Sequence, residues 1–262
     1  EQALLSVWDG VVMGGGVGIS VHGTFRVATE TSLFAMPETV IGLFPDVGTA
    51  HVLSRLPGGL GQYLGLTGTR LRAGDLLYCG LATHVVPRDS LPELEEAIAA
   101  DGGSDPALVL ERFASEVADP ASSMLAQARP RVIDETFGGA SFVEEIVHRL
   151  KVVVASSSVE ASDRTWAQNA LDSLAKASPT ALKVTHRHIS WATTATLQEC
   201  LEQDFRVMQQ HMVTIGDFDE GVRALLIDKD NQPAWSPPTL EDVAGPTVDS
   251  LFAEIQLAEP VF

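Results

Sequence analysis

Two acidic residues, Glu38 and Asp46, stand eight positions apart, and each directly follows a proline. An expected strand over residues 33–36 precedes the first, and an apolar run over residues 41–47 contains the second. A carboxylate in apolar surroundings is costly unless it is paired or used. Two such groups near one turn, with raised pKa values, suit acid–base or nucleophilic chemistry. The alternatives are a helix-capping or surface acid for Glu38 and a helix N-cap for Asp46.

A glycine triplet, Gly14, Gly15 and Gly16, follows an apolar run over residues 4–8. The run predicts a buried strand, and the residues after the triplet, up to about His22, predict a short helix. Glycine allows a sharp bend and the close approach of a ligand atom, and the first amides of a helix have no acceptor within it. We therefore expect Gly15 and Gly16 to face an oxyanion, although an ordinary strand-to-helix turn has the same pattern.

The elements around these residues follow from periodicity and breakers. Further strands are expected over residues 25–28 and 85–87, and helices over residues 48–56, 61–66, 73–78 and 91–100. Successive strands with short helices between them imply an α/β core with mainly parallel pairing.

Helix starts are clearest in the last third of the chain. Ser178 is expected to cap a helix beginning at Pro179, and Thr196 with Glu199 forms a capping box. The helix after this box is predicted to pack through one apolar side, made of Leu197, Leu201, Phe205, Met208 and Met212.

Two weaker signals follow. Asp217 with Glu220 predicts another capping box of the same kind. Beyond Trp235, prolines predict an extended tail; they are Pro237, Pro238 and Pro246, with Pro233 just before.

The order of the motifs resembles the crotonase (enoyl-CoA hydratase/isomerase) superfamily. The motifs are MGGGVGISVHG at residues 13–23, FAMPET at 34–39, GLFPDVG at 42–48, LTG at 66–68, GLATH at 80–84, SPT at 178–180 and EGVRALLIDKD at 220–230. The ordered series is far more specific than any one motif. The resemblance extends to about residue 235 and is weakest between about residues 100 and 160.

The resemblance implies an α/β fold with a ββα spiral core. We expect residues 1–90 to hold the remainder of this core with the active site, and residues 91–262 to form a helical lid and C-terminal region with an extended tail. The family carries an earlier section, which supplies a loop around the adenine of coenzyme A and a second oxyanion-hole amide. We expect the present chain to lack that N-terminal part of the core.

One departure points to a branch of the family. The hydratases place a glutamate at the position of Gly18, which cannot ionise, whereas Asp46 stands where they usually carry glycine. The resemblance to the hydrolase branch implies hydrolysis of a thioester, that of 3-hydroxyisobutyryl-CoA or a similar short 3-hydroxyacyl-CoA, as in valine catabolism.

The resemblance also implies roles for individual residues. Glu38 either attacks the thioester carbonyl or directs water at it, and Asp46 positions the acyl hydroxyl or assists proton transfer. The amides of Gly15 and Gly16 hold the oxyanion. Two further contacts are expected: Phe44 with the substrate and Lys229 with coenzyme A.

No separate cofactor is expected, because coenzyme A is part of the substrate. Two other functions stay open. One is a hydratase or isomerase of the same fold, and the other is a truncated homologue without catalysis.

Composition limits the classes of partner. The chain has 262 residues, 45% hydrophobic and 20% charged, with a formal net charge of −18, which argues against nucleic acid and anionic membranes. Cys79 and Cys200 are too few for a disulfide framework, and metal-ligand spacing is missing, so no metal is expected and a reducing compartment is favoured. No apolar run approaches a bilayer-spanning length. We expect a small acyl-CoA partner, a mitochondrial matrix location if the source is eukaryotic and a cytoplasmic one otherwise; homo-oligomerisation stays open.

Overall fold

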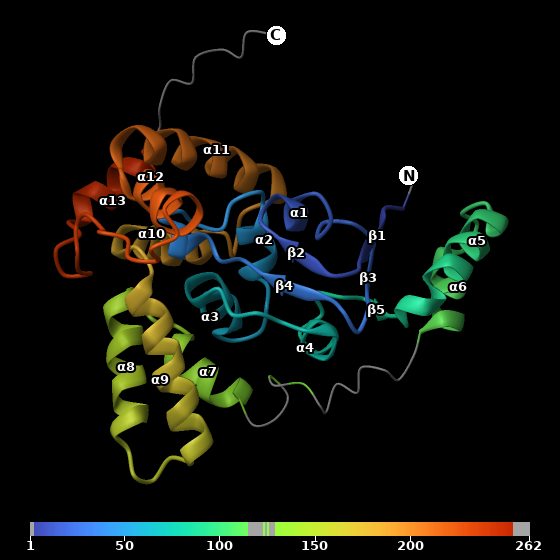
Figure 1. Cartoon of the computed structure of the whole chain (residues 1–262), viewed down its shortest axis with the longest axis horizontal. Helices are drawn as coiled ribbons and strands as arrows, with labels where there is room; N and C mark the ends of the chain where they lie inside the picture. Colours follow the sequence, from blue (N-terminus) through green and yellow to red (C-terminus); the bar gives the residue numbers. More distant parts are fainter. Residues whose placement is uncertain (1–2, 115–122, 124, 126–128, 254–262) are drawn as a thin grey trace, which may run out of the picture. The chain divides into compact units, whose positions relative to one another are not determined.

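The computed structural model describes residues 3–114, 123, 125 and 129–253 (Figure 1). The chain divides into two compact units. The first comprises Glu1–Ala35 and Arg70–Arg131, and the second comprises Met36–Thr69 and Val132–Phe262. Both units take residues from each side of residue 90, so the expected division into 1–90 and 91–262 stays a prediction. The last part of the expected tail, residues 254–262, lies outside the described residues.

The first unit is built on two small parallel sheets. One has the order β1-β3-β5, with β1 (Leu5–Trp8), β3 (Phe25–Ala28) and β5 (His84–Val85). The other pairs β2 (Val11–Met13) with β4 (Leu33–Ala35). The chain therefore adds a strand to each sheet, passes through a helix and returns to the same two sheets, which is one turn of a ββα spiral. The predicted α/β spiral core is confirmed.

The glycine triplet differs in detail from the prediction. A separate strand, β2, stands directly before it, and three residues are too short for a periodicity to reveal. The helix that follows, α1 (Gly15–Gly18), is one turn long, so the expectation of a helix reaching His22 is wrong. Its glycines give it little helix propensity. After the helix, the Ser20 hydroxyl donates a hydrogen bond to the Gly16 carbonyl oxygen (2.5 Å).

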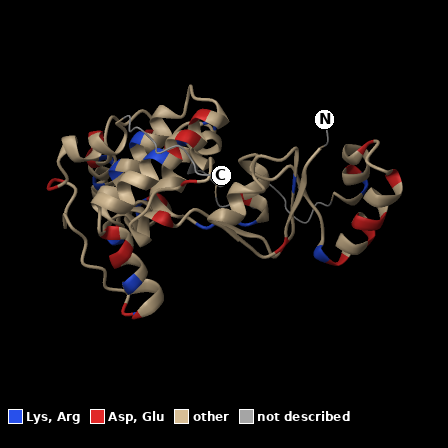
Figure 2. Cartoon of the chain, turned by 90° about the horizontal axis from the view of Figure 1, so that it is seen from above, with Lys and Arg blue, Asp and Glu red and all other residues tan. Residues whose placement is uncertain are grey.

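Short helices complete the first unit: α4 (Ala73–Tyr78), η2 (Arg88–Ser90), α5 (Leu91–Asp101) and α6 (Pro106–Phe113). A left-handed Gly102 ends α5, and the Asp105 carboxylate caps α6 by accepting from the amide of Leu108 (3.0 Å). Most acidic residues of this helix pair lie on α5, as Glu93, Glu95, Glu96 and Asp101, whereas α6 carries Glu111 (Figure 2). The buried faces of α5 and α6 join the sheet in one cluster of Val27, Val86, Leu94, Val109 and Leu110.

Trp8 anchors the turn of the spiral. Its ring lies 5.7 Å from that of Phe34, and its indole N–H donates to the Ser20 hydroxyl (2.9 Å). The Ser32 hydroxyl bonds the Trp8 carbonyl oxygen. Trp8 is therefore fixed by apolar and polar contacts within the first unit.

The second unit is helical. Its elements are η1 (Glu38–Ile41), α2 (Thr49–Leu53), α3 (Leu60–Thr67), α7 (Arg129–Phe137), which enters the unit at Val132, α8 (Val143–Ala155), α9 (Ala161–Lys176), α10 (Pro179–Trp191), α11 (Leu197–Thr214), α12 (Asp217–Val222), the π-helical turn η4 (Arg223–Ile227) and α13 (Gly245–Leu251). Helices α8 and α9 lie side by side as a hairpin (Figure 1).

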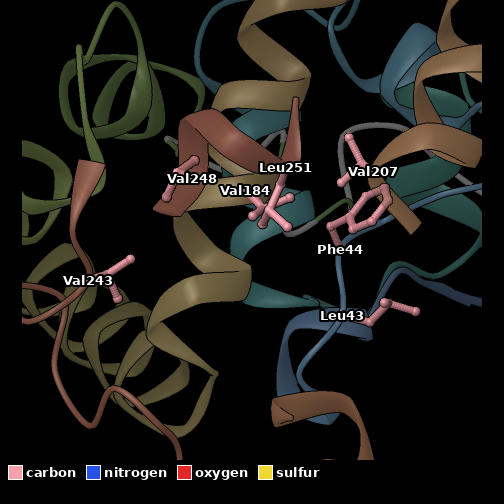
Figure 3. Close-up of a cluster of buried hydrophobic side chains, with 7 residues drawn as sticks. All are labelled: Leu43, Phe44, Val184, Val207, Val243, Val248 and Leu251. Carbon is pink, nitrogen blue, oxygen red and sulfur yellow. The ribbon is translucent and has the colours of Figure 1, made fainter. Parts of the chain in front are cut away.

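The second unit has two apolar centres. One joins α10, α11 and α13 to the segment after η1, through Leu43, Phe44, Val184, Val207, Val243, Val248 and Leu251 (Figure 3). The other is aromatic: the Tyr63 ring lies 5.3 Å from Phe137 and 5.4 Å from Trp166, whose indole N–H donates to the Tyr63 hydroxyl (3.1 Å). Across the described ranges, no helix has both the length and the apolarity needed to cross a membrane.

Two helix starts agree with the sequence. The Ser178 hydroxyl accepts from the amide of Ala181, with Pro179 as the first residue of α10. The Thr196 hydroxyl accepts from the Glu199 amide while the Glu199 carboxylate accepts from the Thr196 amide, so the capping box is confirmed.

The predicted packing side of α11 is largely wrong, although Met208 packs, partly buried, against the apolar centre of Figure 3. Leu201, Phe205 and Met212 are 45%, 53% and 46% exposed. The buried side is instead made of Cys200, Gln203, Asp204, Val207 and His211. Sequence reasoning favoured the more apolar stripe, but polar side chains can be buried where a partner satisfies them, and Asp204 and His211 have such partners.

The expectation of a capping box at Asp217 is also wrong. Gly216 precedes α12, and Asp217 is its buried first residue. The Asp217 carboxylate instead accepts from the Ser178 hydroxyl (2.5 Å) and the Ser236 amide (2.9 Å). The tail after Trp235 is not wholly extended, because Pro246 lies in the first turn of α13, a position that proline tolerates.

Candidate active site

Glu38 is a buried acid without a side-chain partner. It is the first residue of η1 and is 6% exposed, and its Oε2 atom has no hydrogen-bond partner among the described residues. The pKa of Glu38 is raised from 4.5 to about 8, chiefly by burial, against a hydrogen bond from its own amide; the charge of Asp46 contributes to the rise. Glu38 is therefore neither a surface acid nor a helix cap.

The turn that carries Glu38 is held by backbone contacts. Gly42, with φ +74°, ends η1 in the left-handed region, and a Cβ there would overlap the carbonyl oxygen of Asp217. The Thr39 hydroxyl donates to the Leu66 carbonyl oxygen (3.2 Å), and the Ser178 amide donates to the Thr39 carbonyl oxygen (3.0 Å). Contacts with α3 and with the N-cap of α10 thus hold the turn at Thr39, the residue after Glu38.

The backbone that follows Asp46 has an unusual conformation. Val47 (φ +54°) and Gly48 (φ +78°) are consecutive left-handed residues, and such a φ is strained for a β-branched side chain. The Asp46 carbonyl oxygen accepts from the Thr49 amide and hydroxyl (3.0 and 2.7 Å), while Gly48 is the N-cap of α2. The Asp46 carboxylate is therefore not a helix cap, contrary to the alternative reading.

The acidity of Asp46 depends on its neighbours. Burial raises its pKa, and the charge of Asp204 raises it further. Its own amide and His188 act in the opposite direction. Asp46, Asp204 and His188 therefore form one electrostatic cluster, with Glu38 beside it through its interaction with Asp46.

His188 and Asp204 were missed by the sequence reasoning. One oxygen of Asp204 accepts from the Gly48 amide (2.6 Å) and the other lies 2.5 Å from His188 Nε2. His188 is 1% exposed and Asp204 5%; the imidazole stacks on Trp191 at 5.8 Å and meets the Phe44 ring edge-on at 5.6 Å. One signal in the sequence could have pointed to Asp204: its helical spacing places this acid on the same side of α11 as Cys200 and Val207.

The remaining predicted contacts lie in different settings. The side chain of Phe44 is fully buried in the apolar centre of Figure 3, between the rings of His188 and His211. Gly15 and Gly16 are exposed in the first turn of α1, in the other unit, and a methyl group at either would meet nothing within 4 Å. The expected contacts of these three residues with a substrate stay predictions.

Lys229 is exposed at a left-handed position (φ +57°), between two acids that bind Arg223 at 2.8 and 2.7 Å, Asp228 and Asp230. Its contact with coenzyme A stays a prediction. Among the described side chains, no group of three or more His, Cys, Asp or Glu is arranged to hold a metal ion.

A family model described as "Enoyl-CoA hydratase/isomerase" matches residues 1–252. The chain is 41% identical to 3-hydroxyisobutyryl-CoA hydrolase 1 of Arabidopsis thaliana, covering 98% of this chain and 67% of that protein. It is 42% identical to the mitochondrial 3-hydroxyisobutyryl-CoA hydrolase of Mus musculus, covering 97% of this chain and 64% of the relative. The chain thus spans about two thirds of the length of these relatives, and somewhat less in several of them.

Two solved structures are also similar. A carnitinyl-CoA dehydratase from Mycobacterium thermoresistibile has a TM-score of 0.83 and 38% identity, covering 97% of this chain and 68% of that one. An enoyl-CoA hydratase from Rhodobacter sphaeroides has a TM-score of 0.79 and 35% identity, covering 96% and 68%.

Proposed function

Because the chain belongs to the enoyl-CoA hydratase/isomerase family over residues 1–252, we propose that it hydrolyses the thioester of 3-hydroxyisobutyryl-CoA, or of a similar short 3-hydroxyacyl-CoA. The products are the free acid and coenzyme A, as in valine catabolism. Relatives about 42% identical carry the name of this hydrolase. The observation that carries the proposal is the buried Glu38 carboxyl, whose Oε2 has no hydrogen-bond partner among the described residues, beside Asp46 and with Gly18 in place of an acid.

Glu38 has two routes to the acid product. As a nucleophile, its carboxylate oxygen bonds the thioester carbon, the carbon–sulfur bond breaks, and water then hydrolyses the mixed anhydride. As a general base, it takes a proton from water while the water oxygen attacks the same carbon, and the carbon–sulfur bond then breaks to release the thiolate of coenzyme A. Either route requires the carboxylate form, so a pKa of about 8 places the working range of Glu38 at mildly alkaline pH.

Asp46 is proposed to assist Glu38 in one of two ways. Its carboxyl positions the hydroxyl of the acyl group or passes a proton to the leaving thiolate. The raised pKa of Asp46 supports the second role, because a carboxyl with a higher pKa is protonated, and so able to donate, over a wider pH range. The Gly15 amide as oxyanion donor and Lys229 as a contact of coenzyme A are part of the proposal on the family resemblance alone.

The proposal needs no separate cofactor, since coenzyme A enters as part of the substrate. The partner is a small acyl-CoA, and a homo-oligomer is compatible with it. Several relatives are named mitochondrial. We propose the mitochondrial matrix for a eukaryotic source and the cytoplasm otherwise.

A thiol-release assay tests the proposal. The purified chain is incubated with 3-hydroxyisobutyryl-CoA, and free coenzyme A is followed with a thiol reagent, with Glu38→Gln as the inactive control. Turnover by the chain and its loss in the variant are expected. No release above background, or equal release by both proteins, would overturn the proposal.

A second candidate is hydration of a double bond, because the two solved structures of highest TM-score given above are titled a dehydratase and a hydratase. Gly18 opposes this candidate, since it supplies no second acid where hydratases carry glutamate. Incubation with crotonyl-CoA distinguishes the two: loss of the enoyl absorbance without thiol release would favour the hydratase.

A further inference from the structure

The backbone of the Asp46 loop accepts support from α11, where a carboxylate contacts it. The left-handed pair Val47 and Gly48 is strained at Val47 and needs contacts from outside the loop to persist. One such contact is the hydrogen bond that the Gly48 amide donates to Asp204 Oδ2 (2.6 Å), in a buried place. Asp204 therefore determines where the loop, and with it Asp46, is placed.

The second oxygen of Asp204 is held by α10. His188 Nε2 lies 2.5 Å from Asp204 Oδ1, and the imidazole is fixed between the rings of Trp191 and Phe44. A hydrogen bond to each oxygen leaves Asp204 little freedom to turn. The carboxyl of Asp204 therefore stays close to Asp46, whose pKa it raises.

We propose that Asp204 and His188 are positioning residues for Asp46: His188 orients Asp204, and Asp204 holds the Gly48 amide and presents its charge to the Asp46 carboxyl. This inference rests on the proposed function in so far as Asp46 takes part in catalysis. Neither Asp204 nor His188 is assigned a contact with substrate.

The direction of the electrostatic effect follows from the surroundings of Asp46. The titratable groups that act on it are Asp204 from α11 and His188 from α10, and Glu38 on η1 interacts with it in turn. Helix α2, which follows the loop, carries one more titratable residue, His51. Removal of the Asp204 charge lowers the pKa of Asp46, and removal of the His188 ring raises it, since the two act with opposite sign.

The first experiment is carboxyl-carbon NMR titration of Asp46 in the whole chain, which requires no activity. Asp204→Asn is expected to lower the pKa of Asp46, and His188→Gln is expected to raise it. The matched control is Asp75→Asn. Asp75 is also buried and also accepts from a hydroxyl and a backbone amide, those of Ser123 and Leu125. An Asp46 titration unchanged in both test variants would overturn the inference.

Amide exchange in the wild-type chain covers the case in which a variant fails to fold. The Gly48 amide is expected to exchange at least about a hundredfold more slowly than an open loop amide. Exchange at the open-loop rate would show that Asp204 does not hold the loop.

Kinetics then connect the pair to catalysis. Asp204→Asn should shift the Asp46-dependent limb of the kcat–pH profile to lower pH and reduce kcat about tenfold, with little change in KM. Asp75→Asn should leave the profile unchanged. A wild-type chain without thioesterase activity would contradict the proposed function and leave the NMR result standing. An active chain whose pH profile is the same in Asp204→Asn would contradict the positioning role.

Discussion

The turn that carries Glu38 and the loop that carries Asp46 lie in the same unit but control acidity in different ways. Within the described part of the chain, Glu38 Oε2 has no hydrogen-bond partner, and the pKa of Glu38 is raised chiefly by burial. Asp46 is less buried and is surrounded by other charges, whose effects partly oppose one another. The difference shows that Glu38 is suited to gaining and losing a proton near neutral pH, whereas Asp46 is held in place by a network of other groups.

The largest expected effect is on catalysis, where the two carboxyls should differ most. Glu38→Gln should lower kcat for the thioester by about 10³–10⁴-fold, since it removes the only group proposed to attack or activate water. Asp46→Asn should lower it by about 10–10²-fold, because the amide still positions a hydroxyl. Steady-state thiol release measures both. Equal losses in the two variants would show that the carboxyls are not specialised.

The next effect is on stability. The folded pKa of Glu38 is raised from 4.5 to about 8, so the folded state binds more protons between these values. Stability from this residue is fully present below pH 4.5, falls as pH rises and is lost by about pH 8, a change of about 4 kcal/mol. Urea unfolding of wild type and Glu38→Gln at pH 5 and pH 8 measures it. The variant should be relatively more stable at pH 8, and parallel curves would refute the burial argument.

A smaller effect concerns the backbone of the Glu38 turn. Gly42→Ala should destabilise the chain by about 2–3 kcal/mol, because φ +74° is unfavourable for alanine and the Cβ would overlap the Asp217 carbonyl. Thermal unfolding provides the measurement. Gly102→Ala is a control with a positive φ but open space around the Cβ, and it should cost clearly less. Equal losses would mean that the close approach to α12 has no energetic weight.

The smallest effect separates helix stability from site geometry. Thr196→Ala removes the capping box of α11, the helix that carries Asp204, and should cost about 1 kcal/mol. Because Thr196 touches neither carboxyl, the kcat–pH profile should keep its shape. A shifted profile would mean that α11 transmits small changes to the Asp46 loop.

Local signals in the sequence predicted many of the elements and pointed to the two acids, whose catalytic roles stay predictions. The caps at Ser178 and Thr196, the strand before Glu38 and the glycine triplet each depend on residues a few positions apart. Such patterns reflect backbone geometry and hydrogen bonding within one turn, so they can be recognised without knowledge of the fold.

The network around Asp46 could not be predicted in this way. The bond from Gly48 to Asp204 joins residues 156 positions apart, and nothing near Asp204 indicates it. The same reason explains the wrong packing side of α11. Leu201 and Phe205 are the more apolar residues, but the buried side is decided by the partners that α2 and α10 offer to Asp204. Tertiary contacts override local hydrophobicity there.

The positions of the tryptophans have a practical consequence. Of the four in the chain, Trp8 belongs to the first unit and Trp166, Trp191 and Trp235 to the second. The buried Trp8 is therefore a natural fluorophore for the ββα turn, and a Trp8→Phe variant would emit from the helical unit alone. Fluorescence-detected melting of the two proteins would show whether the units lose structure at the same temperature or one after the other.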